Sequence, residues 1–226
     1  MNRSIGGIWK MMLLDVRTSA AIFWAILFFV YGLLALLLYR FGGGEATTGG
    51  LTPMYIYMVI LGIVALRETL PYALGMSVRR KDYYFGLLGG GLAVAAAFSA
   101  FSTLLSRIEQ AVFAGADIRI SFFSMPVYRT IGLGGEWGSQ FVFLASAFAL
   151  GMMLALLHKR FGNISLYLFF AGLFLAATAL HLFDGWPAVF EWLLSLDSIV
   201  DLSLWVLPVT ALLALVSFVL LRRATV

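Results

Sequence analysis

The sequence predicts an all-α, polytopic membrane protein with six transmembrane helices, and three observations support this fold class. Of the 226 residues, 62% are hydrophobic and 12% are charged, whereas a soluble domain carries about 25% charged residues. The apolar residues gather in six runs, and the basic residues gather in alternate connections between them. Such a chain cannot hide its apolar surface in a water-facing fold.

The six apolar runs set the domain organisation. A helix rises about 1.5 Å per residue, so roughly 20 residues cross a hydrocarbon core of roughly 30 Å. The second run reaches that length only if it continues through Arg67 and Glu68 towards Val78. We expect a single transmembrane domain over 1–226, with an interface helix over 1–19, a six-span bundle over 20–221 and a cytoplasmic tail over 222–226. The runs are 20–39, 53–65, 84–105, 140–157, 164–182 and 202–221.

Charge asymmetry orients this bundle. With the N-terminus in the cytoplasm, ten basic residues and two acids face inward, and four basic residues and eight acids face outward. Short cytoplasmic connections carry the excess of Lys and Arg, so both termini are predicted to be cytoplasmic. The pI of about 9.5 therefore reflects topology and does not indicate nucleic-acid binding.

The N-terminal segment has helical amphipathic spacing. Its apolar residues fall at i, i+3, i+4, i+7 and i+8, with Arg3, Lys10 and Arg17 largely off that face. This favours a helix lying in the cytoplasmic interface. The alternative is that its basic residues only fix topology. The apolar face consists of Ile5, Ile8, Trp9, Met12 and Leu13.

Three predicted outside connections differ in character. The glycine-rich stretch 42–50 is expected to be a flexible loop. The stretch 106–137 is too long for a tight turn and is expected to have structure of its own. The stretch 184–200 is too short to span and predicts either a short surface helix before the sixth span or a re-entrant hairpin.

The third span carries small residues four positions apart, which let helix backbones approach closely in lipid. These residues predict packing within the chain or, alternatively, a dimer face. They are Gly86, Gly90, Gly91 and Ala95.

The sequence offers little for catalysis. It has no cysteine, no Gly-Lys step of a phosphate-binding loop and no catalytic serine or zinc motif. His158 lies in a basic connection, whereas His181 with Asp184 forms either a metal or proton site or a structural hydrogen bond. The spans hold no charge between their ends except in the extended second one, which argues against ion-driven transport. We therefore expect no enzyme activity, no catalytic residue, no metal and no cofactor in this chain.

The segment RETLPYALGMSVRRKDYYF at 67–85 resembles permease subunits of bacterial, Firmicute-like ABC-2-type transporters. Those permeases have an N-terminal interface helix, six spans, a coupling helix after the second span and short outside helices before the sixth. The resemblance implies a coupling element here, whereas the basic cluster alone also suits a solvated turn. The implied ATPase-coupling residues are Arg67, Glu68, Pro71, Tyr72, Leu74, Gly75, Met76, Ser77, Arg79, Arg80 and Lys81.

The resemblance also implies a location and partners. It implies the bacterial plasma membrane, a second permease subunit in a homodimer or heterodimer, membrane lipids, and a cytoplasmic ATPase that holds ATP and Mg²⁺. The expected function is ATP-driven export of a hydrophobic or amphipathic molecule such as a lipid, peptide or antibiotic. The alternative is a non-transporting scaffold or sensor subunit. An intramembrane enzyme is a third class, for which no catalytic set is present.

Overall fold

The computed structural model describes residues 3–41, 44–76, 78–113, 118–128 and 131–223, except for a few side chains within those ranges. Over these residues the fold is all-α, apart from one small sheet, and six helices (α1–α5 and α7) are long and apolar enough to cross a membrane. This confirms the predicted fold class and six candidate spans. The elements are α1 (Arg3–Arg40), β1 (Gly44–Thr47), α2 (Thr52–Gly75), α3 (Arg80–Val112), β2 (Ile118–Ser121), η1 (Pro126–Tyr128), α4 (Leu133–Phe161), α5 (Asn163–Leu182), α6 (Gly185–Leu194) and α7 (Ile199–Arg223).

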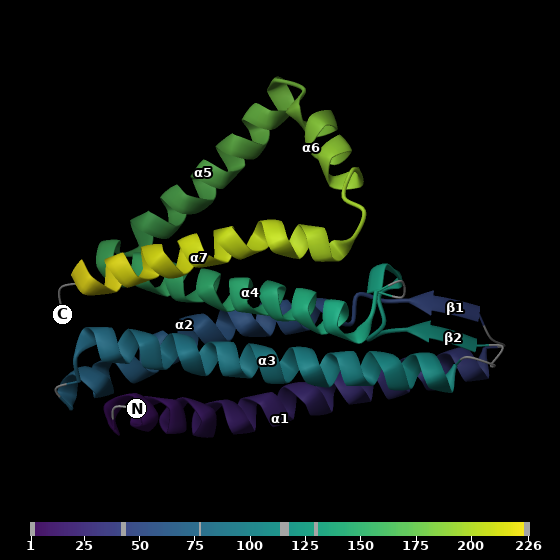
Figure 1. Ribbon diagram of the computed structural model, residues 1–226, viewed down its shortest axis with the longest axis horizontal. Helices are drawn as coiled ribbons and strands as arrows, with labels where there is room; N and C mark the ends of the chain where they lie inside the picture. Colours follow the sequence, from purple (N-terminus) through teal and green to yellow (C-terminus); the bar gives the residue numbers. More distant parts are fainter. Residues whose placement is uncertain (1–2, 42–43, 77, 114–117, 129–130, 224–226) are drawn as a thin grey trace.

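Helix α4 is the centre of the bundle. It packs against α2, α3 and α7, while α1 lies along the other side of α3 (Figure 1). Hydrogen bonding within each helix satisfies the backbone polar groups, which is the condition for crossing lipid. A hydroxyl also ties α3 to α7, because Tyr84 donates to the carbonyl oxygen of Ala214.

Glycines allow the closest helix contacts. A Cβ added to Gly151 of α4 would lie 2.1 Å from the carbonyl oxygen of Val59, and one added to Gly62 of α2 would lie 2.5 Å from the carbonyl oxygen of Phe148. Both distances are far below van der Waals contact and both involve backbone. The α2–α4 packing therefore requires glycine at these two positions, which the sequence analysis did not single out.

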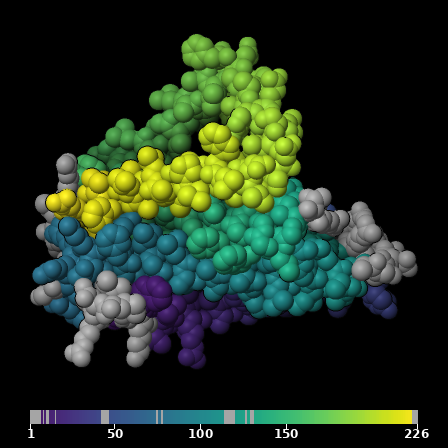
Figure 2. Space-filling view, in the orientation of Figure 1, coloured from purple at the N-terminus to yellow at the C-terminus, as the bar shows by residue number. Residues whose placement is uncertain are grey.

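The α5–α6 hairpin stands apart from the other helices. Figure 1 shows α5 leaving the end of α4 at an angle and α6 returning to α7, and Figure 2 shows a gap between α5 and α7. No residue of α5 or α6 is buried. Gly162 makes the sharp α4–α5 turn with φ of 74°, a conformation that L side chains rarely adopt. At the other end, the rings of Trp192 and Trp205 join α6 to α7 edge to face.

Several connections differ from the sequence expectations. The prediction that 42–50 is a flexible loop is wrong for residues 44–47, because Gly44–Thr47 pairs in parallel with Ile118–Ser121, with Gly44 opposite Ile118. The pairing comes from a partner strand more than seventy residues away, so local composition did not reveal it. The predicted structure within 106–137 is confirmed, since α3 runs to Val112 and strand β2 and η1 follow.

Two helices extend further than the apolar runs suggested. Helix α2 continues through Arg67 and Glu68 to Gly75, as a spanning second helix requires. Helix α1 is unbroken from Arg3 to Arg40, so no separate helix over 1–19 precedes the first span. The position of its first turns at a membrane interface stays a prediction.

The short helix expected before the last span is present as α6, and whether it enters a bilayer is likewise still a prediction.

Candidate functional site

The predicted coupling residues lie at one end of the bundle, which we call the basic end. It comprises the α2–α3 connection (67–81), the α4–α5 turn (158–163) and Arg222, and Figure 1 places both chain termini towards it. Among the described residues, the α2–α3 connection contains no separate helix: it is the last two turns of α2, a turn, and the start of α3.

The last two turns of α2 have an exposed face and a buried face. Arg67, Glu68, Pro71, Gly75 and Met76 are exposed, and Tyr72 is 65% exposed. Ser77 and the side chain of Leu74 lie outside the described residues. Beyond the turn, Arg79 and Lys81 are exposed, and Arg80 is partly buried. The exposed face is therefore accessible to a partner.

The buried face fixes α2 to α3. Thr69 and Tyr83 are both buried, and their hydroxyl oxygens are 2.8 Å apart in a hydrogen bond across the connection. Leu70 and Ala73 are buried beside them, and the Val78 amide donates to the Ala73 carbonyl at 3.1 Å. A force on the exposed face would consequently reach both helices.

The predicted interface and packing residues lie against one another. A Cβ on Gly90 would be 2.6 Å from the Met12 sulfur, and one on Gly91 would be 2.1 Å from the Phe148 ring. Gly86 and Ala95 are buried in the same helix, while Leu13 is 44% exposed. Trp9 packs over Gly89, and the side chains of Ile5 and Ile8 lie outside the described residues. Gly90 and Gly91 therefore serve contacts within the chain, at Met12 and Phe148.

The opposite end holds a buried polar network that sequence analysis missed. We call it the sheet cap: β1, β2, residues 121–128, Ile131 and the facing ends of α3 and α4. Glu109 is only 2% exposed, and its carboxylate accepts the amides of Phe122, Phe123 and Ser124 at 2.7, 2.9 and 2.8 Å. Three charge-assisted bonds to backbone amides fix the chain that follows β2 onto α3.

A second buried carboxylate lies nearby on α4. Glu136 is fully buried, and its Oε2 is 2.9 Å from Nη2 of Arg107, which is 32% exposed and also donates to the Ile131 carbonyl at 3.0 Å. Oε1 of Glu136 has no hydrogen-bond partner in the described part of the chain. One turn further in, Ser102 donates to Gln140. The α3–α4 contact is thus polar at the cap.

Tyr128 completes the cap from η1. Burial raises the pKa of its phenol above the ordinary value of 10.0, the neighbouring Tyr55 and Glu136 raise it further, and a hydrogen bond with Ser139 partly opposes them. The aromatic pair Phe122–Phe123 packs against Tyr31 of α1 with ring centroids 5.5 Å apart in both cases. The run SFFSMPVY, unusually apolar for a loop, was the available signal that 121–124 and Tyr128 are packed.

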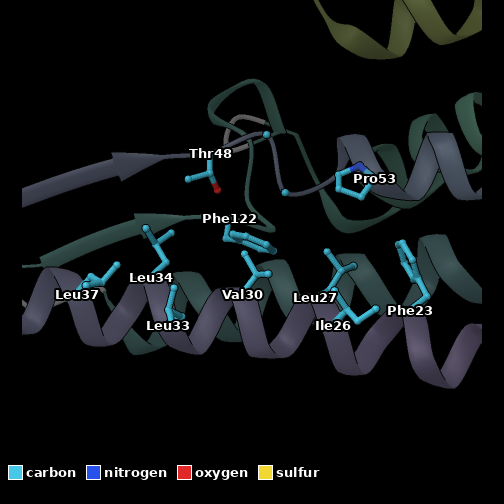
Figure 3. Close-up of a pocket in the computed structure, with 12 residues that line it drawn as sticks. Phe23, Ile26, Leu27, Val30, Leu33, Leu34, Leu37, Thr48, Pro53 and Phe122 are labelled. Carbon is cyan, nitrogen blue, oxygen red and sulfur yellow. The ribbon is translucent and has the colours of Figure 1, made fainter.

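Two mainly apolar grooves flank the bundle near the cap. One, of about 470 Å³, lies between α1 and the β1–α2 connection; Figure 3 shows Phe122 between the loop that carries Thr48 and the α1 face around Val30. The other, of about 730 Å³, lies between α2, α4 and α7 and includes Val59, Leu150 and Val206, with Tyr128 at its edge. Such linings suit apolar or amphipathic molecules.

The two histidines do not assemble a site. His158 is exposed at the end of α4, and His181 is exposed near Asp184, whose amide bonds the His181 backbone carbonyl at 3.3 Å. Over the described residues, no group of three His, Cys, Asp or Glu side chains is placed to hold a metal ion.

The fold and its two ends are compatible with a multi-pass, all-helical membrane protein. Comparisons with protein-family models, curated proteins and solved structures find no match to this chain. A more specific function must therefore come from the geometry and from the resemblance at 67–85.

Proposed function

We propose that this chain is the membrane-spanning permease subunit of an ATP-driven ABC exporter in a bacterial plasma membrane, and that a separate cytoplasmic ATPase docks on the α2–α3 connection at the basic end. One observation carries the proposal: the exposed face of α2 at Arg67–Gly75 is fixed to α3 through buried Thr69 and Tyr83. A rigid exposed element between two spans passes a rigid-body motion into the bundle.

The apolar grooves support a hydrophobic or amphipathic cargo. The groove between α2, α4 and α7 is lined almost entirely by apolar side chains and borders α2, the helix that ends in the coupling face. Movement of α2 against α4 would change its shape. A second permease subunit has room against α5, none of whose residues is buried. ATP and Mg²⁺ would bind on the partner ATPase and not on this chain.

Co-purification tests the partner. The tagged chain is extracted from its native membranes in mild detergent, and the proteins that accompany it are identified by mass spectrometry. We expect a stoichiometric ATPase with a phosphate-binding loop, which is lost when residues 67–82 are scrambled. Absence of an ATPase with the intact chain would contradict the proposal and favour the scaffold or sensor function.

Charge reversal tests the coupling face itself. Arg67→Glu and Glu68→Arg should each uncouple ATP hydrolysis from transport while the chain still inserts and folds. Arg222→Glu is the matched control, because Arg222 is exposed at the same end but outside the α2–α3 connection. Unchanged coupling in both variants, or equal loss in the control, would remove the docking assignment.

A further inference from the structure

A third groove lies at the basic end, between α2, α4 and α5, and has a volume of about 600 Å³. Its walls are apolar, with Ile63 and Leu66 on α2, Leu154 on α4, and Leu166 and Phe170 on α5. Its polar residues are all basic or imidazole groups: Arg67, His158 and Lys159. An apolar groove with basic groups at one end matches a molecule that has an anionic headgroup and an apolar chain.

The charges of Arg67 and Lys159 are not neutralised by the chain. No ion pair engages Arg67, His158 or Lys159 in the part of the chain that the structure describes, and all three are exposed. Glu68, the neighbour of Arg67, lines a different cavity beside Met12 and Val16 on the α1 side of α2. The groove therefore keeps its positive charge.

The composition and exposure of α5 indicate which kind of amphiphile fits the groove. The helix has no Asp, Glu, Lys or Arg over its 20 residues, and none of its residues is buried. If α5 crosses the bilayer, its surface is covered by acyl chains, and Arg67, His158 and Lys159, which line the groove beside the first turns of α5, lie at headgroup depth. Basic pockets between transmembrane helices at a cytoplasmic surface bind anionic lipid headgroups.

We propose that this groove binds one anionic phospholipid, with its phosphate held by Arg67, His158 and Lys159 and an acyl chain lying between α2, α4 and α5. The lipid occupies the space between α5 and the helices α2 and α4, and so stabilises the α4–α5 turn. The proposal depends on the chain being a membrane protein. It does not depend on the exporter function.

The experiment uses the full chain purified in mild detergent, titrated with phosphatidylglycerol or with phosphatidylcholine of the same acyl chains. Native mass spectrometry counts the lipids that stay bound. We expect one phosphatidylglycerol to be retained in preference to phosphatidylcholine. Because each cation near an anionic headgroup contributes about a fivefold preference, Lys159→Gln should lower the preference about fivefold, and His158→Gln should lower it as well.

Two controls make the result decisive. Arg17→Gln removes the same charge from an exposed position outside the groove and should keep the preference. Glycerol phosphate, which has the anionic group without acyl chains, should not displace the lipid at equal concentration. Equal retention of both lipids, equal loss in Arg17→Gln, or displacement by glycerol phosphate would each overturn the proposal. The melting temperature of every variant checks that it is folded.

Discussion

The two ends of the bundle differ in whether their charged side chains are buried or exposed. At the sheet cap, Glu109 and Glu136 are buried: the Glu109 carboxylate accepts backbone amides, and one oxygen of Glu136 forms an ion pair with Arg107. At the basic end, Arg67, Glu68 and Lys159 are exposed and take part in no ion pair among the described residues. Charge at the cap stabilises the fold, and charge at the basic end is available to bind something else.

The difference teaches that charge counts alone do not separate structural from functional residues. A buried carboxylate must be hydrogen bonded or paired, since an unpaired one costs several kcal/mol. An exposed charge costs the fold almost nothing to change. The two ends should therefore respond to mutation in distinct ways, and stability measurements can test the comparison directly.

The largest loss of stability is expected for Glu109→Ala. It leaves three amides without an acceptor, and each unsatisfied buried group costs roughly 1–3 kcal/mol. We expect a loss of about 3 kcal/mol or more in the free energy of unfolding, measured by thermal or denaturant unfolding in detergent. Glu109→Gln keeps one acceptor oxygen and should lose less. Glu191→Ala, at an exposed carboxylate of α6, is the control, and an equal effect there would refute the role of the cap.

The next effect concerns the two partners of the buried pair. Arg107→Leu leaves the fully buried Glu136 without its partner. Breaking a fully buried pair costs about 3–5 kcal/mol, and the loss here should fall at or below the lower end of that range because Arg107 is 32% exposed. Glu136→Gln should cost less, because Arg107 is 32% exposed and can reach water. The double variant with leucine at both positions should recover part of the loss, since apolar replacements of buried pairs are often tolerated. Equal costs for the two single variants would show that the burial difference is unimportant.

A smaller effect is expected at Tyr128 in alkali. Burial raises the pKa of its phenol above 10.0, so the folded chain holds this proton more tightly than the unfolded chain. Its contribution to stability is complete below pH 10 and is lost as the pH rises above that value. We compare the free energy of unfolding of the parent chain with that of Tyr128→Phe. Above pH 10 the difference between the two should narrow by up to about 1.4 kcal/mol per pH unit. Parallel unfolding profiles over this range would contradict the prediction.

The smallest effect on stability is expected at the basic end. Arg67→Glu and Glu68→Arg should change the free energy of unfolding by no more than about 0.5 kcal/mol, as is usual for surface substitutions. The same unfolding assay used for the cap variants measures this. A loss comparable to that of Arg107→Leu would mean that the charges on α2 support the fold, and the contrast between the two ends would fail.

Some features could be predicted because they depend on local pattern. The six apolar runs predicted six helices, and Gly90 and Gly91 were recognised as packing residues from their spacing. The continuation of α2 past Glu68 followed from the length needed to span a bilayer. The cap could not be predicted this way. Glu109 and Phe122 are 13 residues apart, and nothing in the residues between them marks the carboxylate as an acceptor for those amides.

The sequence by itself determined the helices and the uneven charge of the connections, because helix formation in an apolar run and charge along the chain are local properties. Only the tertiary structure decided that 44–47 pairs with 118–121, that Gly62 and Gly151 allow α2 to touch α4, and that Glu136 is buried while Arg67 is exposed. Each of these depends on segments distant in the chain meeting in space. Burial, which sets the cost of every charge and every added Cβ, exists only after they have met.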